Sequence, residues 1–287
     1  MKNNYRGVDD SISFSKVVNR LREFCLGKGF IEVHTQDRLS ILAACEDPDT
    51  VAIYEYMGEI WPLPQTGQMW LEYELLTQPE LAGVFCVSTS YRNEPNPVPG
   101  RHKLIFPMFE FELKGGIKEL EAFETELLEF MGFGSENDFN YHSYDSLAKH
   151  YETDELSHDH EAKMQDDFGP IVFCKNFPAT TSPFWNMKKM NDTHSHKIDV
   201  IMYGHETIGS AERSSNVEEM RNEFYTISEG GYSEKLFDLF GKTRVEKELN
   251  EFLDLNFFPR SGGGIGLTRL INACKKGGIM NTLNNNN

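Results

Sequence analysis

The chain has 287 residues, of which 39% are hydrophobic and 25% charged, as in an ordinary globular protein with a sizeable core. Its 28 Lys and Arg residues are outnumbered by 45 Asp and Glu residues, which gives a net charge of −17. This balance disfavours a broad basic surface for nucleic acid, although it is compatible with a local basic groove.

Cysteines and apolar runs bear on the cellular compartment. The five cysteines, which are odd in number and form no CxxC pair, are Cys25, Cys45, Cys86, Cys174 and Cys274. Reduced core thiols are favoured over a zinc site or a disulfide framework. The sequence has neither a charged-then-apolar leader nor an apolar run of membrane length. We therefore expect a cytoplasmic protein without a membrane partner.

Helices and strands are predicted to alternate in the first part of the chain. The predicted segments are a helix over 14–25, a strand over 30–34, an acidic irregular stretch over 35–60, a helix over 69–76, and strands over 83–90 and 104–113. Gly27 and Gly29 end the first helix, and three prolines make 95–100 a loop.

The two strands around this loop form a hairpin that collects polar side chains. In the returning strand, Phe109 and Phe111 face one side, and Glu110 and Glu112 face the other, because side chains alternate along a strand. The hairpin therefore places several chemically active residues around one cleft, namely Arg92, Glu94, His102, Glu110 and Glu112.

The second half of the chain continues with mixed elements. The predicted segments are an amphipathic helix over 120–130 with a glutamate-rich outer face, a polar surface insertion over 132–168, strands over 169–174 and 198–204, and helices over 217–253. Within the insertion, His158-Asp159-His160-Glu161 resembles a metal cluster. A solvated helix is favoured, because adjacent residues on a helix point in different directions. Residues 1–11 and 276–287 are predicted to be flexible.

Strands with hairpin returns, followed by helices, favour an α+β fold with an antiparallel sheet over a parallel doubly wound one. A glycine-rich loop, Gly262-Gly263-Gly264-Ile265-Gly266, precedes a helix that contains Arg269. Glycines let the backbone approach a bulky ligand, and arginine matches phosphate oxygens. Together with Arg92, this loop predicts a triphosphate site held from two sides.

Two separated stretches carry a resemblance to a known family. They are Tyr91-Arg92-Asn93-Glu94 with Arg101, His102 and Phe106, and Gly264-Ile265-Gly266-Leu267-Thr268-Arg269. They resemble the second and third motifs of the class II aminoacyl-tRNA synthetases of the aspartate/asparagine/lysine subgroup. Residues 14–35 look like the first motif, with Gln36 where the family usually has proline. The resemblance covers about residues 12–275 and implies a homodimer whose sheet has six or more antiparallel strands flanked by helices.

The resemblance also implies ATP and magnesium as cofactors. Arg92 would contact the α-phosphate and the incoming carboxylate, and Arg269 would be its catalytic partner on the phosphate tail. The implied ATP-binding residues are Arg92, Glu94, Arg101, His102, Phe106, Gly264, Gly266 and Arg269. Asp199 and Glu206, seven residues apart, match the metal-binding pair. Simpler roles also exist for these residues: ion pairs for the arginines, a strand-end charge for Asp199, and core packing for Phe106.

The amino-acid pocket is similar to the asparagine type. The residues that the resemblance assigns to it are Thr66, Gln68, Glu72, Glu110, Glu112 and Arg213. Leu71 stands where aspartate enzymes have the lysine that meets the substrate carboxylate, so an amide or another polar side chain is favoured over free aspartate. Glu110 is expected to receive the substrate ammonium group.

The acceptor is the least defined part of the reaction. Members of this subgroup that charge tRNA carry an N-terminal anticodon-binding barrel, and this chain begins almost at the first motif. We therefore expect an adenylate-forming ligase with a non-tRNA acceptor. The alternatives are tRNA charging by a stripped core, an asparagine synthetase that uses ammonia, and a non-catalytic sensor of amino acids or nucleotides.

Overall fold

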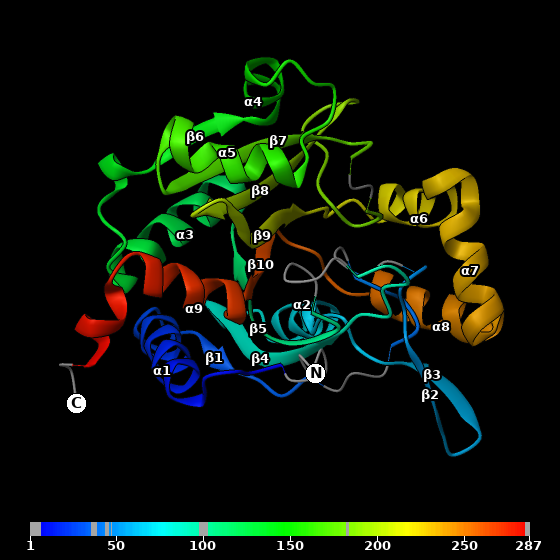
Figure 1. The fold of residues 1–287 in the computed structure, drawn as a ribbon. Helices are drawn as coiled ribbons and strands as arrows, with labels where there is room; N and C mark the ends of the chain where they lie inside the picture. Colours follow the sequence, from blue (N-terminus) through cyan, green and yellow to red (C-terminus); the bar gives the residue numbers. More distant parts are fainter. Residues whose placement is uncertain are drawn as a thin grey trace.

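The computed structural model describes residues 7–35, 39–43, 46, 48–97, 103–181 and 184–284. Its centre is an eight-stranded sheet in the order β1-β4-β5-β10-β9-β8-β7-β6 (Figure 1). In that order the strands are β1 (Ile31–Glu32), β4 (Gly83–Tyr91), β5 (Ile105–Lys114), β10 (Arg260–Gly266), β9 (His205–Arg213), β8 (His194–Met202), β7 (Ile171–Pro178) and β6 (Asn140–Ser143). Only the outermost pairings, β1 with β4 and β6 with β7, are parallel. This arrangement confirms the predicted α+β fold.

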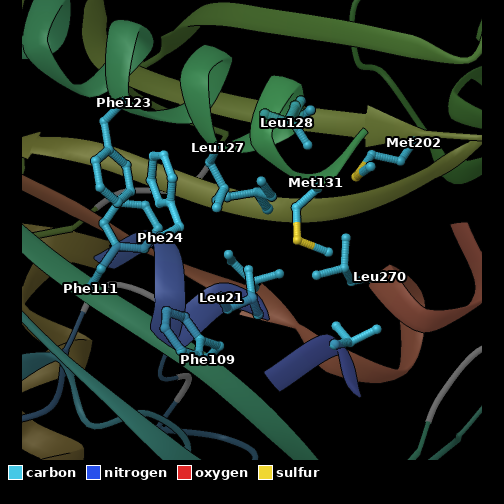
Figure 2. Close-up of a cluster of buried hydrophobic side chains, with 14 of the residues drawn as sticks. Leu21, Phe24, Phe109, Phe111, Phe123, Leu127, Leu128, Met131, Met202 and Leu270 are labelled. Carbon is cyan, nitrogen blue, oxygen red and sulfur yellow. The ribbon is translucent and has the colours of Figure 1, made fainter. Parts of the chain in front are cut away.

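Three helices cover one face of the sheet, namely α1 (Ser11–Gly27), α3 (Ile117–Met131) and α9 (Leu267–Lys276). Figure 2 shows Phe109 and Phe111 of β5 together with side chains of these helices, such as Phe24 and Phe123. The rings of Phe111 and Phe123 lie 4.6 Å apart between centroids. This core fixes which way β5 faces, so that Glu110 and Glu112 point to the opposite side of the sheet, as predicted.

The other face carries the remaining helices and the site. They are α2 (Gln68–Thr77), α4 (Tyr144–His150), α5 (His158–Phe168), α6 (Val217–Thr226), α7 (Gly231–Phe240) and α8 (Lys242–Leu253). Helices α6 to α8 pack around Trp185 in a second apolar cluster. A hairpin of β2 (Ile53–Tyr56) and β3 (Glu59–Pro62) projects from this side (Figure 1).

Two predictions of local structure were wrong. The stretch 35–60 is not irregular throughout, because β2 and the start of β3 lie in it. The glycine-rich stretch is not a loop but β10, which lies between β5 and β9. Glycine has a low strand propensity, yet here the neighbouring side chains fill the space that a Cβ would need. The proline-rich loop falls partly outside the described residues.

The helix predicted over 120–130 is present as α3, but its glutamates are not all on the outer face. Glu124 is fully buried, and neither of its carboxylate oxygens has a hydrogen-bond partner. Burial raises its pKa to about 8, with Ser210 acting in the opposite direction. The amphipathic pattern missed this residue, because a carboxylate on the apolar side is not expected without a partner.

The polar segment 132–168 supplies β6, α4 and α5, so it extends the sheet at one end. His158 and Asp159 are exposed at the start of α5, whereas Glu161 accepts a hydrogen bond from the backbone N–H of Glu206 (3.2 Å). Near the other end of the described chain, Ile279 is only 4% exposed, in a stretch for which the sequence predicted a flexible tail.

The cysteines agree with the sequence-based expectation. Four of them, Cys25, Cys86, Cys174 and Cys274, are buried free thiols, and Cys45 lies outside the described residues. No helix in the described ranges is long and apolar enough to cross a membrane.

Candidate active site

A cavity of about 910 Å³ opens on the face of the sheet that carries Glu110, and residues of α9 form part of its wall. Twelve of the predicted site residues line it: Thr66, Gln68, Arg92, Glu94, Phe106, Glu110, Asp199, Glu206, Arg213, Gly264, Gly266 and Arg269. Glu72 and Glu112 lie beneath it with 0% exposure. Arg101 and His102 lie outside the described residues. Residues from distant parts of the chain thus meet around one hollow.

Small residues in the middle of the sheet make the floor of this cavity. Gly264 pairs with Gly209 on one side and with Glu110 on the other. A Cβ on Gly264 would lie 2.7 Å from Cε of Met108, and one on Gly262 would overlap the Glu112 carboxylate. Glycine is therefore required by close packing, and it leaves the backbone open to a large ligand.

The two predicted catalytic arginines approach the cavity from different elements. Arg92 follows β4, where its backbone N–H donates to the Leu104 carbonyl (2.7 Å) and its Nε lies 3.4 Å from Ser90 Oγ. Arg269 is in the first turn of α9 and donates from a guanidinium nitrogen to the Glu206 carbonyl (2.5 Å). Both cations line the same hollow, which is the arrangement that a triphosphate bound from two sides requires.

Glu110 is held firmly at the far end of the cavity. Its carboxylate accepts hydrogen bonds from the Gly67 backbone N–H (2.9 Å) and from the hydroxyl groups of Thr66 and Ser88. Its side chain is only 2% exposed, yet it lines the cavity. A buried carboxylate with several donors is a rigid anion that can receive a substrate ammonium group.

Arg213 belongs to a network of four buried charged side chains. Arg213 donates to Glu112 through two nitrogens (3.2 Å each), and Arg260 donates to Glu72 through its Nε (2.9 Å). Arg213 and Glu72 are also only 3.8 Å apart, so the two pairs form one network. Each of the four side chains is at most 2% exposed. Glu72 and Glu112 thus hold the arginines instead of lining the cavity.

The pKa values of the two glutamates in this network shift in opposite directions. Burial opposes the ionisation of Glu72, but Arg260 and Arg213 outweigh it and hold the pKa of Glu72 below its usual value. Burial raises the pKa of Glu112 to about 7, because Arg213 offsets it only in part. Glu72 is therefore the more readily ionised of the two, and both carboxyl groups lie against Arg213.

Asp199 and Glu206 fit a magnesium ion that is shared with phosphate oxygens. Oδ1 of Asp199 is buried without a hydrogen-bond partner. A Cβ on Gly209 would lie 3.5 Å from this atom and 3.1 Å from Oε1 of Glu206, so the two oxygens converge over a glycine. Magnesium favours one or two protein carboxylates plus substrate phosphates. No group of three metal-binding side chains occurs within the described residues.

Several charged residues of this site were not predicted from the sequence: the buried Arg260, and Asp9, Lys103, Lys197, Lys275 and Lys276 of the cavity wall. Arg260 anchors Glu72, and Lys197 lines the cavity with its Nζ 2.9 Å from Oδ2 of Asp199. The signal for Lys197 was available, since a residue two before Asp199 in a strand lies on the same face. The signal for Arg260 was not, because its partner Glu72 is 188 positions away in the sequence.

The family of the chain follows from comparison with known proteins. The family model described as tRNA synthetases class II (D, K and N) matches residues 10–278. The chain therefore belongs to the class II tRNA synthetases of this group, as the two motifs had indicated. Enzymes of this family use ATP and magnesium.

Proteins that are similar to this chain include aspartate and asparagine members of the family. The aspartate–tRNA(Asp) ligase of Pyrobaculum aerophilum is 28% identical over 120 residues, which are 42% of this chain and 25% of the relative. The asparaginyl-tRNA synthetase of Pyrococcus horikoshii, solved with asparaginyl-adenylate, superposes with a TM-score of 0.74 at 20% identity. The match covers 93% of this chain and 65% of the other.

A third comparison gives the same fold. The aspartyl-tRNA synthetase of Entamoeba histolytica has a TM-score of 0.68 at 17% identity, and the match covers 90% of this chain and 54% of the other. At such identities the structural likeness shows the fold alone. The chain spans about a quarter to two-thirds of the length of these relatives.

Proposed function

We propose that this chain activates an amino acid with ATP and forms an aminoacyl adenylate and pyrophosphate. The observation that carries the proposal is the common cavity of Arg92, Arg269 and Glu110. Two separated cations suit the two ends of a triphosphate, and the buried anion suits an amino group. Together they select for ATP and an amino acid held side by side.

The reaction needs positioning and charge stabilisation but no protein nucleophile. A carboxylate oxygen of the amino acid attacks the α-phosphorus, a new P–O bond forms, and the bond to the β-bridging oxygen breaks to release pyrophosphate. Arg92 stabilises the negative charge that builds on the α-phosphate, and Arg269 stabilises the leaving pyrophosphate. Asp199 and Glu206 would hold magnesium, which supplies further neutralisation of the phosphate tail.

The same proposal includes an amide-bearing substrate similar to asparagine. Arg213 already contacts two buried carboxyl groups, those of Glu112 and Glu72, so a substrate carboxylate beside it would be desolvated next to groups of like charge. A neutral amide oxygen can accept a hydrogen bond from Arg213 at a lower cost. Leu71, buried with 1% exposure, supplies no cation where aspartate enzymes have a lysine.

The acceptor and the assembly also belong to this proposal. The net charge of −17 disfavours a long polyanion, which supports a small acceptor such as ammonia or an amine. A homodimer is supported by exposed apolar side chains on α1 and β1, at the edge of the sheet. These are Ile12, Leu26 and Ile31, with exposures of 70%, 56% and 46%.

Pyrophosphate exchange into ATP over a panel of amino acids tests the proposal. We expect exchange with asparagine at a rate well above that with aspartate, and loss of exchange in Arg92→Ala. Arg244→Ala is the matched control, because Arg244 pairs with the exposed Glu59. No exchange with any amino acid would contradict the proposed activity and leave a nucleotide or amino-acid sensor. Adding tRNA or ammonia to the active mixture identifies the acceptor.

A further inference from the structure

Lys197 is a cation built into the predicted metal site. It is in β8, and its Nζ lies 2.9 Å from Oδ2 of Asp199 and 4.0 Å from the ring centre of Phe177. Its side chain is only 18% exposed, and it lines the same cavity as Asp199 and Glu206. The ion pair and the ring together hold the ammonium group at a fixed position beside the carboxylates.

The two oxygens of Asp199 therefore have different surroundings. Oδ2 accepts the hydrogen bond from Lys197, whereas Oδ1 is buried without a partner and lies beside Gly209. Oε1 of Glu206 lies over the same glycine. Only one side of Asp199 is open to a divalent ion, since Lys197 covers the other.

Building on the proposed function, we propose that Lys197 competes with divalent metal at Asp199 and supplies part of the positive charge that the triphosphate requires. An ammonium group binds phosphate oxygens as a compact point charge with three donors. With Lys197 on Oδ2, Oδ1 is the oxygen of Asp199 that would hold a magnesium ion. The ammonium group of Lys197 thus supplies part of the positive charge that a metal ion would otherwise supply to the triphosphate.

The competition predicts opposite changes in two affinities when the charge is removed. In Lys197→Met, Asp199 loses its ion pair, and we expect Mn²⁺ to bind the nucleotide-free protein about tenfold more tightly. In EDTA, a non-hydrolysable ATP analogue should bind this variant about tenfold more weakly than it binds the wild type. A lysine with only a structural role would give neither change.

Lys175→Met is a matched control. Lys175 is in the adjacent strand β7, pairs with Glu121 (2.7 Å) and lies 5.3 Å from the ring centre of Tyr141, but it is absent from the cavity wall. We expect both affinities of this control to equal those of the wild type. Lys197→Gln serves as a second neutral variant if Lys197→Met does not fold, as judged by circular dichroism.

Electron paramagnetic resonance of Mn²⁺ measures the first affinity without nucleotide, so it is independent of catalysis. Tighter Mn²⁺ binding in the neutral Lys197 variants, but not in the control, supports the competition. Unchanged or weaker Mn²⁺ binding overturns it, and so does the lack of measurable binding in every protein. If the Mn²⁺ result is as expected but the ATP analogue binds no variant under any condition, the proposed activation of amino acids fails and the competition stands.

Discussion

The buried pair of Arg260 and Glu72 should be essential to the stability of the site. Arg260→Met removes one charge of the pair and leaves Glu72 desolvated among Gln68, Asn186 and the more distant Arg213. Breaking a fully buried ion pair from one side typically costs about 3–5 kcal/mol of unfolding free energy. We expect about 3 kcal/mol, because Glu72 keeps two amide donors. This loss is a large part of the total stability of a domain.

Urea unfolding followed by tryptophan fluorescence measures this change. The control Lys247→Met removes an exposed pair with Glu251 and should cost less than about 1 kcal/mol. The double variant Glu72→Gln with Arg260→Met leaves no unpaired charge, so it should be more stable than Arg260→Met alone. A cost for Arg260→Met equal to that of the control would refute the buried network. A double variant whose cost equals the sum of its two single costs would refute the coupling between the two charges.

Three further predictions concern other parts of the chain. Burial raises the pKa of Glu124 from 4.5 to about 8, so the folded state binds this proton more tightly than the unfolded state does. The free energy of unfolding of the wild type should therefore fall as the pH rises from 4.5 to about 8, by up to about 1.4 kcal/mol per pH unit from this residue. Glu124→Gln should make this slope smaller, because other buried carboxyl groups such as Glu112 also contribute to it, whereas Glu121→Gln should leave it unchanged. Equal slopes for the two variants in urea titrations would count against burial of Glu124 as a cause. Arg213→Ala should raise the KM for the amino acid about 10- to 100-fold and leave the affinity for ATP unchanged, and a parallel loss of both would deny it a specific role. Leu26→Glu should convert the dimer to a monomer in light scattering, whereas Met57→Glu at the exposed hairpin should not, and a monomeric wild type would disprove the interface.

Much of the fold and the site was predictable because its signals are local. The alternation of Phe109 and Phe111 with Glu110 and Glu112 predicted the two faces of β5. The face with the glutamates is the one on which the cavity lies. The arginines of the two motifs were recognisable from the residues around them. The seven-residue spacing likewise puts Asp199 and Glu206 on the two strands of one hairpin, where Asp199 pairs with Gly209 and Glu206 pairs with Ile201.

The missed features depend on contacts between distant segments. The glycines of β10 look like a loop until β5 and β9 are placed on either side of it. Glu124 looked solvated because its helix position alone does not reveal what covers it. Arg260 required knowledge of α2, which supplies Glu72, and of the sheet on which α2 packs.

A crystal structure with a non-hydrolysable ATP analogue and asparagine tests the central claim most directly. We predict the α-phosphate at Arg92, the end of the triphosphate at Arg269, and the amino group of asparagine at Glu110, all within the one cavity. Nucleotide bound elsewhere on the chain, or an analogue in the cavity that contacts neither arginine, would contradict the account.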